Sequence, residues 1–197
     1  MKSIRAKKHW NAAGAASCLL LLTAGCVFTQ ASSHETRYYD LDMPEIVPQK
    51  VMVLSSINNA TAARQRMLYR HADGRITHDE YNLWIQQPEQ LLTRYWFNML
   101  SLEDTPQAER MLHLRAVLTA FEIDLRNKKV IVALNYEFRI HDRARRDGTL
   151  RCTESFAEET PEAFAAAFST CARKLGHELL KIGAGLPEAK NPASARK

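Results

Sequence analysis

The sequence predicts a single α+β domain, in which a mainly antiparallel β-sheet carries two amphipathic helices on one face. Residues 110–156 alternate apolar and polar side chains, as expected of a three-stranded antiparallel meander. Residues 88–101 and 160–182 repeat their apolar side chains every three or four positions, which is the period of a helix with one buried face. One face of the meander should be wet, so the helices are expected on the other.

The first 25 residues have the organisation of a secretory signal peptide. Four basic residues and no acidic one lead into a small, apolar run from Ala12 to Leu22. This run is too short to span a bilayer permanently, and small residues follow it. We therefore expect residues 1–25 to be removed and the mature protein to leave the cytoplasm.

Cys26 resembles the lipidated cysteine of bacterial lipoproteins. Ala24 and Gly25 stand directly before it, as small residues do in a lipobox, although Thr23 occupies a position where leucine is usual. An ordinary secretory cleavage site is the alternative, as is processing at Cys18, but the rest of the apolar run follows Cys18. Several acyl chains, palmitate among them, would make anchoring at Cys26 effectively permanent.

The residue after the cysteine is Val27, so the aspartate that often retains lipoproteins at the inner membrane is missing. We therefore expect Cys26 to sit in the outer membrane, facing the periplasm. Residues 26–36 are small and polar without periodicity, and should form a tether that reaches at most about 33 Å. The domain is expected over residues 37–185, followed by a disordered tail over residues 186–197.

The charge of the mature chain excludes some functions. Cleavage removes four basic residues, leaving 27 − 4 = 23 basic against 22 acidic residues and a net charge of +1. A nearly neutral chain makes no electrostatic case for binding nucleic acid. The remaining 172 residues suffice for one domain with its own core.

The first half of the domain should contain short strands. Residues 37–41 alternate into a brief strand, and the fuller apolar run of residues 50–57 is expected of a central strand. Residues 67–70 form another short strand, and the turn at residues 72–75, with its Asp-Gly pair, leads into a partner strand from Ile76.

The second half should be more regular. In the meander we expect a bulge near Val117, a turn at residues 126–128 and a basic turn at residues 143–148. The middle strand is the cleanest, and its predicted inward side chains are Val130, Val132, Leu134, Tyr136, Phe138 and Ile140. Its predicted outward side chains are Asn135, Glu137, Arg139 and His141.

Both helices carry start signals. Pro88 suits the first turn of the earlier helix, which should end near Ser101. Thr160 is a helix N-cap, followed by Pro161 and Glu162. The predicted buried stripe of the later helix is Phe164, Phe168, Cys171, Leu175, Leu179 and Ile182, ended by Gly183 and Gly185.

Cys152 and Cys171 are an even pair on predicted core faces, one on a strand and one on a helix. In an oxidising compartment we predict a disulfide between them, closing a loop of about 20 residues and stabilising by about 3 kcal/mol. Two buried free thiols are the alternative.

Two sets of residues are candidates for a partner surface. Tyr81 and Trp84 lie just before the first helix, and the alternative is that they fill the corner where strand meets helix. Arg143, Arg145 and Arg146 could meet an anionic partner, or form a solvated hairpin tip.

The sequence favours a protein that is not an enzyme. It lacks nucleophile-elbow, P-loop and dinucleotide motifs, and its histidines are scattered without metal-ligand spacing. Asp79 and Glu80 could be imagined as an acid/base pair, but neighbours on a strand point to opposite faces. We therefore expect no catalytic residues, no cofactor and no metal.

Several segments together resemble the ABC-type transport auxiliary lipoproteins, the PqiC/YmbA-like partners of MCE-domain systems. The resemblance covers about residues 37 to 183, and its most specific part is the segment with Trp84. The matching features are the lipobox, Tyr38-Tyr39-x-Leu41, Met67-Leu68-Tyr69-Arg70, Glu80-Tyr81-x-x-Trp84 running into Pro88-x-x-Leu91-Leu92, and Phe121-Glu122. The chain departs from the family's Arg-Trp-Ala-x-Pro-like run at residues 83–88, and in the loop at residues 58–63.

The resemblance implies an outer-membrane lipoprotein that assists an ABC-driven system moving lipids or other hydrophobic molecules between membranes. Its partner would be a periplasmic MCE-domain protein, and homo-oligomer formation stays open. Two rivals remain: an envelope-assembly lipoprotein, such as a regulator of cell-wall synthesis or a secretion-system component, and a lipid-binding shuttle.

Overall fold

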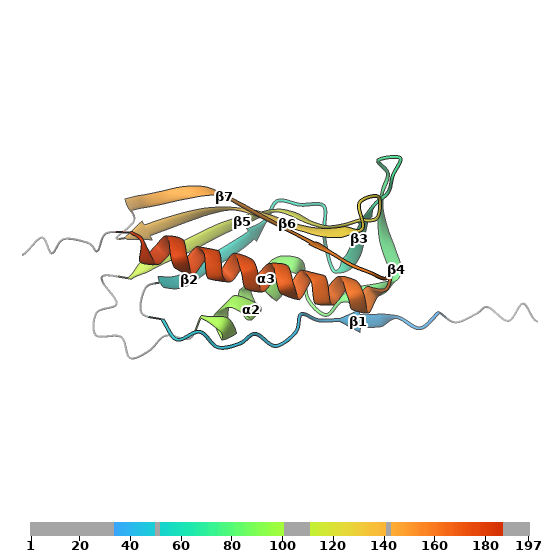
Figure 1. Ribbon diagram of the computed structural model, residues 1–197, viewed down its shortest axis with the longest axis horizontal. Helices are drawn as coiled ribbons and strands as arrows, with labels where there is room; N and C mark the ends of the chain where they lie inside the picture. Colours follow the sequence, from blue (N-terminus) through green and yellow to red (C-terminus); the bar gives the residue numbers. More distant parts are fainter. Residues whose placement is uncertain (1–33, 50–51, 101–110, 141–142, 187–197) are drawn as a thin grey trace, which may run out of the picture. The chain divides into compact units, whose positions relative to one another are not determined.

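The computed structural model describes residues 34–49, 52–100, 111–140 and 143–186 (Figure 1). The predicted leader, Cys26, most of the tether and nearly all of the predicted tail lie outside these ranges. The described elements are β1 (Arg37–Tyr39), β2 (Met52–Asn59), β3 (Arg66–Arg70), β4 (Ile76–Trp84), α2 (Pro88–Met99), β5 (Leu112–Asp124), β6 (Lys129–Ile140), β7 (Arg143–Ser155) and α3 (Pro161–Ala184).

The strands form one mixed sheet of seven strands in the order β1-β4-β3-β5-β6-β7, with β2 paired to β5 beside this path. The pairs β3–β4, β5–β6 and β6–β7 are antiparallel, whereas β1–β4, β2–β5 and β3–β5 are parallel. With two helices added to this sheet, the predicted α+β class is confirmed.

The prediction of a central strand at residues 50–57 is wrong. Among the described strands, β2 pairs with β5 alone, and it shares that edge of β5 with β3. The apolar run reflects burial beneath α2, whose helix packs on β2, rather than a neighbouring strand on each side. The hydrophobicity of a strand indicates which of its faces are buried, but it does not indicate how many neighbouring strands are hydrogen-bonded to it.

The meander is confirmed as β5, β6 and β7. The bulge lies between Leu118 and Ala120, two residues beyond the predicted position near Val117. It brings Leu118 and Phe121, which have opposite parity, to the same buried face.

The outer face of the meander is less wet than predicted, because Ile131 and Ala133 are buried there. Ile131 lies opposite Glu122, and Ala133 lies opposite Arg151. The stems of such long side chains can cover small apolar neighbours while their charged ends stay in water. His141, predicted to face outward, lies outside the described residues.

The predicted basic turn at residues 143–148 is also wrong, because these residues form the first half of β7. Arg143 pairs with Ile140, and Gly148 pairs with Tyr136. A Cβ atom at position 148 would meet the Tyr136 hydroxyl oxygen at 2.7 Å, so glycine leaves room for this ring across the strand. The half-strand is polar because it lies exposed at the edge of the sheet, where nothing selects apolar residues.

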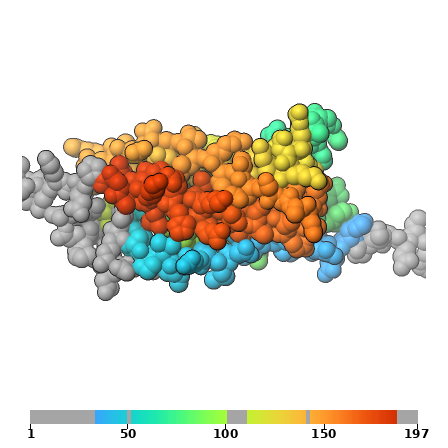
Figure 2. Space-filling view, in the orientation of Figure 1, coloured from blue at the N-terminus to red at the C-terminus, as the bar shows by residue number. Residues whose placement is uncertain are grey.

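The two helices lie side by side on the core face of the sheet (Figure 1). Trp96 of α2 donates an indole hydrogen bond to the carbonyl oxygen of Ala172 in α3 at 2.8 Å. Gly176 permits this contact, because a Cβ there would meet Met99 Sδ at 2.8 Å and Trp96 at 3.1 Å. Figure 2 shows α3 covering much of the visible surface of this face.

The helix boundaries follow the sequence signals. The Thr160 side chain accepts a hydrogen bond from the backbone nitrogen of Ala163, which confirms it as the N-cap of α3. Gly185 is the C-cap, whereas Gly183 lies buried within the last turn instead of ending the helix. Within the described ranges, neither helix is long and apolar enough to cross a membrane.

Residues 40–49, here called the strap, run from β1 along both helices. The backbone nitrogen of Asp42 donates to Ser169 Oγ of α3 at 2.8 Å, and that of Val47 donates to the carbonyl oxygen of Met99 in α2 at 2.7 Å. Asp40 also forms an ion pair with Arg94 of α2. The strap therefore ties the segment that follows the predicted tether to both helices.

Candidate functional site

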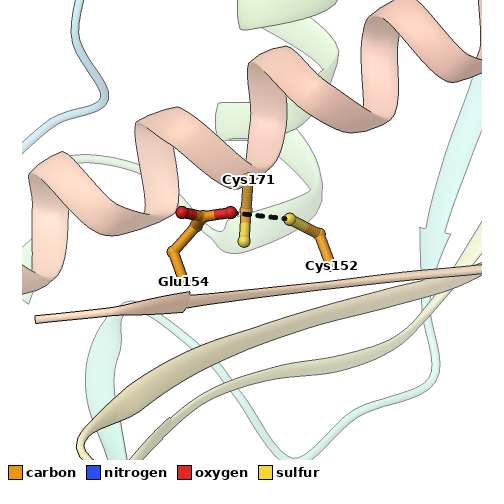
Figure 3. Close-up of side chains that lie close together, drawn as sticks. All are labelled: Cys152, Glu154 and Cys171. Atoms are coloured by element: carbon orange, nitrogen blue, oxygen red, sulfur yellow. Dashed lines mark hydrogen bonds between the residues drawn. The ribbon is translucent and has the colours of Figure 1, made fainter.

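The most chemically distinctive group in the described part of the chain is formed by Cys152, Glu154 and Cys171 (Figure 3). The two sulfur atoms and a carboxylate oxygen all lie within 4.8 Å of one another. We call these three residues the dithiol cluster. Both cysteines are buried, as expected of core faces, and both are free thiols, so the disulfide between them stays a prediction.

Local structure explains why these groups meet. Cys152 and Glu154 are two residues apart on β7, so their side chains share one face of the sheet. Cys171 projects from α3, which covers that face, and the close-up shows its sulfur pointing toward the strand. Cys171 is fully buried and Cys152 is 9% exposed, so Cys152 is the more accessible of the two residues.

A lysine from α3 adds a positive charge next to the dithiol cluster. Lys174, one helical turn after Cys171, forms an ion pair and hydrogen bond with Glu154. The Cys152 thiol donates to the same carboxylate at 3.7 Å. A hydrogen bond from Cys171 lowers the pKa of Cys152, whereas the hydrogen bond with Cys152 together with burial raises the pKa of Cys171.

The cluster could in principle support two kinds of chemistry. Neighbouring thiols can exchange with a disulfide, and two thiolates with a carboxylate could ligate a thiophilic cation such as Zn²⁺. No metal site was predicted from the sequence, because the spacing of these three residues matches no metal motif. The one indication in the sequence was that Cys152 and Glu154 are two residues apart on a predicted strand, so their side chains should face the same side of the sheet.

Trp84 is not part of a partner surface. Its side chain is only 1% exposed and packs edge-on against Phe121 and Phe168, with ring centroids 5.5 and 5.2 Å away. The corner-filling alternative is therefore the correct one for Trp84. Tyr81, three residues earlier, is 40% exposed and remains at the surface.

Arg143, Arg145 and Arg146 are exposed, as expected of a surface that could meet an anionic partner. They lie on edge strand β7 instead of on a hairpin tip: Arg143 and Arg146 pair with β6, and Arg145 lies where the register shifts. The sequence-predicted candidates are therefore separated: the arginines and Tyr81 lie at the surface, and Trp84 lies in the core.

Asp79 has a structural role in β4. Its carboxylate accepts hydrogen bonds from the Tyr69 hydroxyl at 2.7 Å, and from the backbone nitrogens of Tyr81 and Asn82 at 2.9 Å each. The Asn82 side chain donates as well, at 2.9 Å. Burial opposes ionisation, but these hydrogen bonds outweigh it and lower the pKa of Asp79. Through these hydrogen bonds the Asp79 carboxylate stabilises the part of β4 where the pairing register with β3 shifts.

The surface hollows lined by described residues include the following two. One, of about 200 Å³, is bounded by the strap and both helices and includes Tyr95 and Arg173. The other, of about 240 Å³, lies over β2, β5 and β6 and includes Arg115 and Glu137. Both are smaller than the roughly 300–1,000 Å³ of typical ligand pockets, so neither supports the lipid-shuttle alternative.

No family model matches the chain, and no curated protein matches it. The solved structures that are similar in fold include the following two. One is described as a crystal structure of an uncharacterized protein; it has a TM-score of 0.63 at 10% identity, and the alignment covers 75% of this chain and 98% of that one. The other is protein XCC0632 from Xanthomonas campestris, described as DUF330.

The Xanthomonas campestris protein has a TM-score of 0.54 at 17% identity, with 75% of this chain and 90% of that one covered. At such low identity the likeness concerns the fold alone. The chain therefore shares its α+β architecture with both proteins over nearly their whole lengths.

Proposed function

We propose that this chain is an exported lipoprotein, anchored through Cys26 in the outer membrane, that acts in the periplasm as a non-catalytic docking component of an ABC-driven, MCE-associated transport system. The observation that carries the proposal is the lipobox-type leader ahead of a folded α+β unit. The tether is about ten residues long, so an anchored domain would stay within about 33 Å of the membrane.

The arrangement of the segments that resemble the auxiliary lipoproteins supports a common fold. Tyr38 and Tyr39 of β1 pair in parallel with Leu83 and Trp84 of β4. Phe121 of β5 packs on Trp84. Residues that are far apart in the sequence and carry the resemblance are thus neighbours, which is expected when such residues specify a fold.

Arg70 and Glu122, also within these segments, form a two-pronged ion pair across β3 and β5, at 2.9 and 2.8 Å. This pair and the Trp84 core contact make the matching segments structural. A partner contact must then be sought among exposed residues outside the buried part of these segments.

Exposed apolar side chains offer such positions. Met43, Phe97 and Ile46 are 86%, 75% and 64% exposed, the highest values among the large apolar residues that the structure describes. Phe97 belongs to α2, and the other two belong to the strap bonded to α2. Apolar and aromatic side chains supply most of the affinity at protein interfaces.

The anchor is tested by growing cells with an alkyne-bearing palmitate analogue and following the full chain. We expect labelled wild-type protein in the outer-membrane fraction, and loss of both label and membrane association in Cys26→Ala. Cys18→Ala is the matched control and should behave as the wild type. An unlabelled, freely soluble wild-type protein would contradict the anchor.

The docking role is tested by mild crosslinking in the intact envelope, followed by purification and identification of the attached proteins. We expect an MCE-domain protein, with recovery reduced about tenfold or more by Phe97→Asp if α2 forms the contact. The triple variant Arg143→Gln, Arg145→Gln, Arg146→Gln tests the β7 surface in parallel. Recovery of a cell-wall synthase or a secretion ring instead would overturn the proposal in favour of an envelope-assembly role.

A further inference from the structure

We propose that Cys152 and Cys171 form a redox pair, in which Cys152 attacks an incoming disulfide and Cys171 then closes the bond that links β7 to α3. The oxidant is a disulfide, carried by glutathione or by a thiol–disulfide oxidoreductase. In the cell the reaction depends on the proposed export, but the chemistry belongs to the folded chain and can be tested apart from the anchor.

The geometry assigns different tasks to the two cysteines. Cys171 is fully buried, so a bulky donor cannot reach its sulfur. Cys152 is slightly exposed, on the edge strand, and the partly exposed Glu154 and Lys174 flank it. Disulfide exchange begins with the more accessible thiolate, so Cys152 is the attacking group.

Glu154 and Lys174 are suited to assist this attack. The Cys152 thiol donates a hydrogen bond to the Glu154 carboxylate, which holds the thiol in place. The charge of this carboxylate raises the pKa of Cys152, and the Lys174 ammonium bonded to it offsets this effect with a positive charge that favours the Cys152 thiolate. Both are positioning residues, since the reacting atoms are sulfur.

The exchange then balances in two steps. The Cys152 thiolate attacks one sulfur of the donor disulfide, forming a mixed disulfide and releasing one donor thiolate. Cys171 loses its proton and attacks the Cys152 sulfur, which forms the Cys152–Cys171 bond and releases the second donor thiolate. The two protons end on the two donor thiols, and two electrons pass from the cysteine pair to the donor.

Cation binding is the less favourable use of this cluster. A structural Zn²⁺ site usually has four protein ligands, and the described cluster offers three. One of these three, Glu154, is bonded to Lys174, whose charge would oppose a cation. A disulfide needs only the two sulfur atoms and leaves the ion pair intact.

The bond would have a structural consequence. β7 is the outer strand of the sheet and pairs with β6 alone among the described strands. A covalent link from Cys152 to α3 would fasten this edge to the C-terminal helix across a loop of about 20 residues, a length for which loop-closure theory predicts appreciable stabilisation.

The test uses the full chain carrying Cys18→Ala and Cys26→Ala, which leaves Cys152 and Cys171 as its two cysteines, purified in reduced form and incubated with glutathione disulfide. We expect two thiols to become resistant to maleimide, a linked Cys152–Cys171 peptide by mass spectrometry, and a melting temperature about 10 °C higher than after reduction. The double variant Cys152→Ala, Cys171→Ala should show no such response to oxidant or reductant. Persistent labelling of both cysteines after prolonged oxidation would overturn the proposal.

Further measurements separate the roles. Cys171→Ala should accumulate a mixed disulfide with glutathione, whereas Cys152→Ala should not. Lys174→Met should slow oxidation about tenfold at neutral pH and shift its pH profile upward, while Lys181→Met, on the same helix, should leave both unchanged. If a chelator alone restores maleimide labelling, without a reductant, the protection comes from a bound cation and the disulfide is excluded.

Discussion

The sheet consists of two halves that are built by different connections. In the meander half, β5, β6 and β7 follow one another along the chain and pair antiparallel, with α3 packed across them. In the mixed half, β3 and β4 form a local antiparallel pair, but β1, β2 and β3 join the sheet through parallel pairs with distant segments, and α2 packs on β2. Neighbouring strands can find each other locally, whereas parallel pairs require long crossovers.

The mixed half therefore depends more heavily on side-chain contacts with the rest of the molecule. β1 contains only three residues, and its pairing with β4 ends at Trp84. Trp84 packs against β5 and α3, which belong to the meander half. The core around Trp84 thus joins the two halves through side chains, in addition to the backbone pairs of β2 and β3 with β5.

Removal of the Trp84 side chain should have the largest effect on this junction. We expect Trp84→Ala to lower the free energy of unfolding by about 4 kcal/mol, because a large, fully buried ring leaves a cavity against Phe121 and Phe168. Urea denaturation followed by circular dichroism measures it. Phe97→Ala, at an exposed position, is the control and should change stability by less than about 0.5 kcal/mol. Equal losses in both variants would contradict a junction at Trp84.

A smaller loss should follow when the packing between the two helices is disturbed. Gly176→Ala places a methyl group against Met99 and Trp96, and we expect a net destabilisation of about 2 kcal/mol despite the better helix propensity of alanine. Gly185→Ala is the matched control, since its Cβ would meet only ordinary contacts at 3.6 Å. Thermal unfolding should show a lower melting temperature for the first variant alone. A stabilised Gly176→Ala protein would contradict the expected clash of the new methyl group with Met99 and Trp96.

The smallest effect is expected at Asp79, which acts within the mixed half alone. Asp79→Ala should cost about 1 kcal/mol, because the groups that donate to the carboxylate are partly exposed and can turn to water. The pKa of Asp79 is lowered in the folded state, so its stabilisation is present above the unfolded pKa of about 4 and is lost as the pH falls through the folded pKa.

The difference in unfolding free energy between wild type and Asp79→Ala should accordingly be constant near neutral pH and shrink in acid. Urea denaturation at a series of pH values measures this difference. Glu80, the exposed neighbour on β4, provides the control substitution Glu80→Ala, which should show no such change with pH. A difference that grows in acid would reverse the assigned sign.

The sequence predicted the meander half better than the mixed half. Alternation identified β6, and the Thr160 signal located the start of α3, because both depend on neighbours along the chain. The errors concern residues whose polarity reflects a tertiary position. Exposure at the sheet edge gave β7 a polar start that resembled a turn, and cover by α2 made β2 resemble a central strand.

The candidate site shows the same division. Cys152 and Cys171 were predicted on core faces, and they meet. Glu154 was not predicted to join them, because its parity with Cys152 becomes meaningful only when α3 brings Cys171 and Lys174 above β7. Trp84 was marked as distinctive by the sequence, but its burial depends on Phe121 and Phe168 from two distant elements.

By itself, the sequence determined the elements with strong local signals: the antiparallel meander, the two amphipathic helices and their starts. It also determined that cysteines stand on two faces that could be apposed. The tertiary structure alone decided the parallel strand pairs, the edge position of β7 and the placement of Glu154 and Lys174 beside the two thiols. The physical reason is that periodicity and capping act over a few residues, whereas sheet order and burial arise from contacts between segments far apart in the chain.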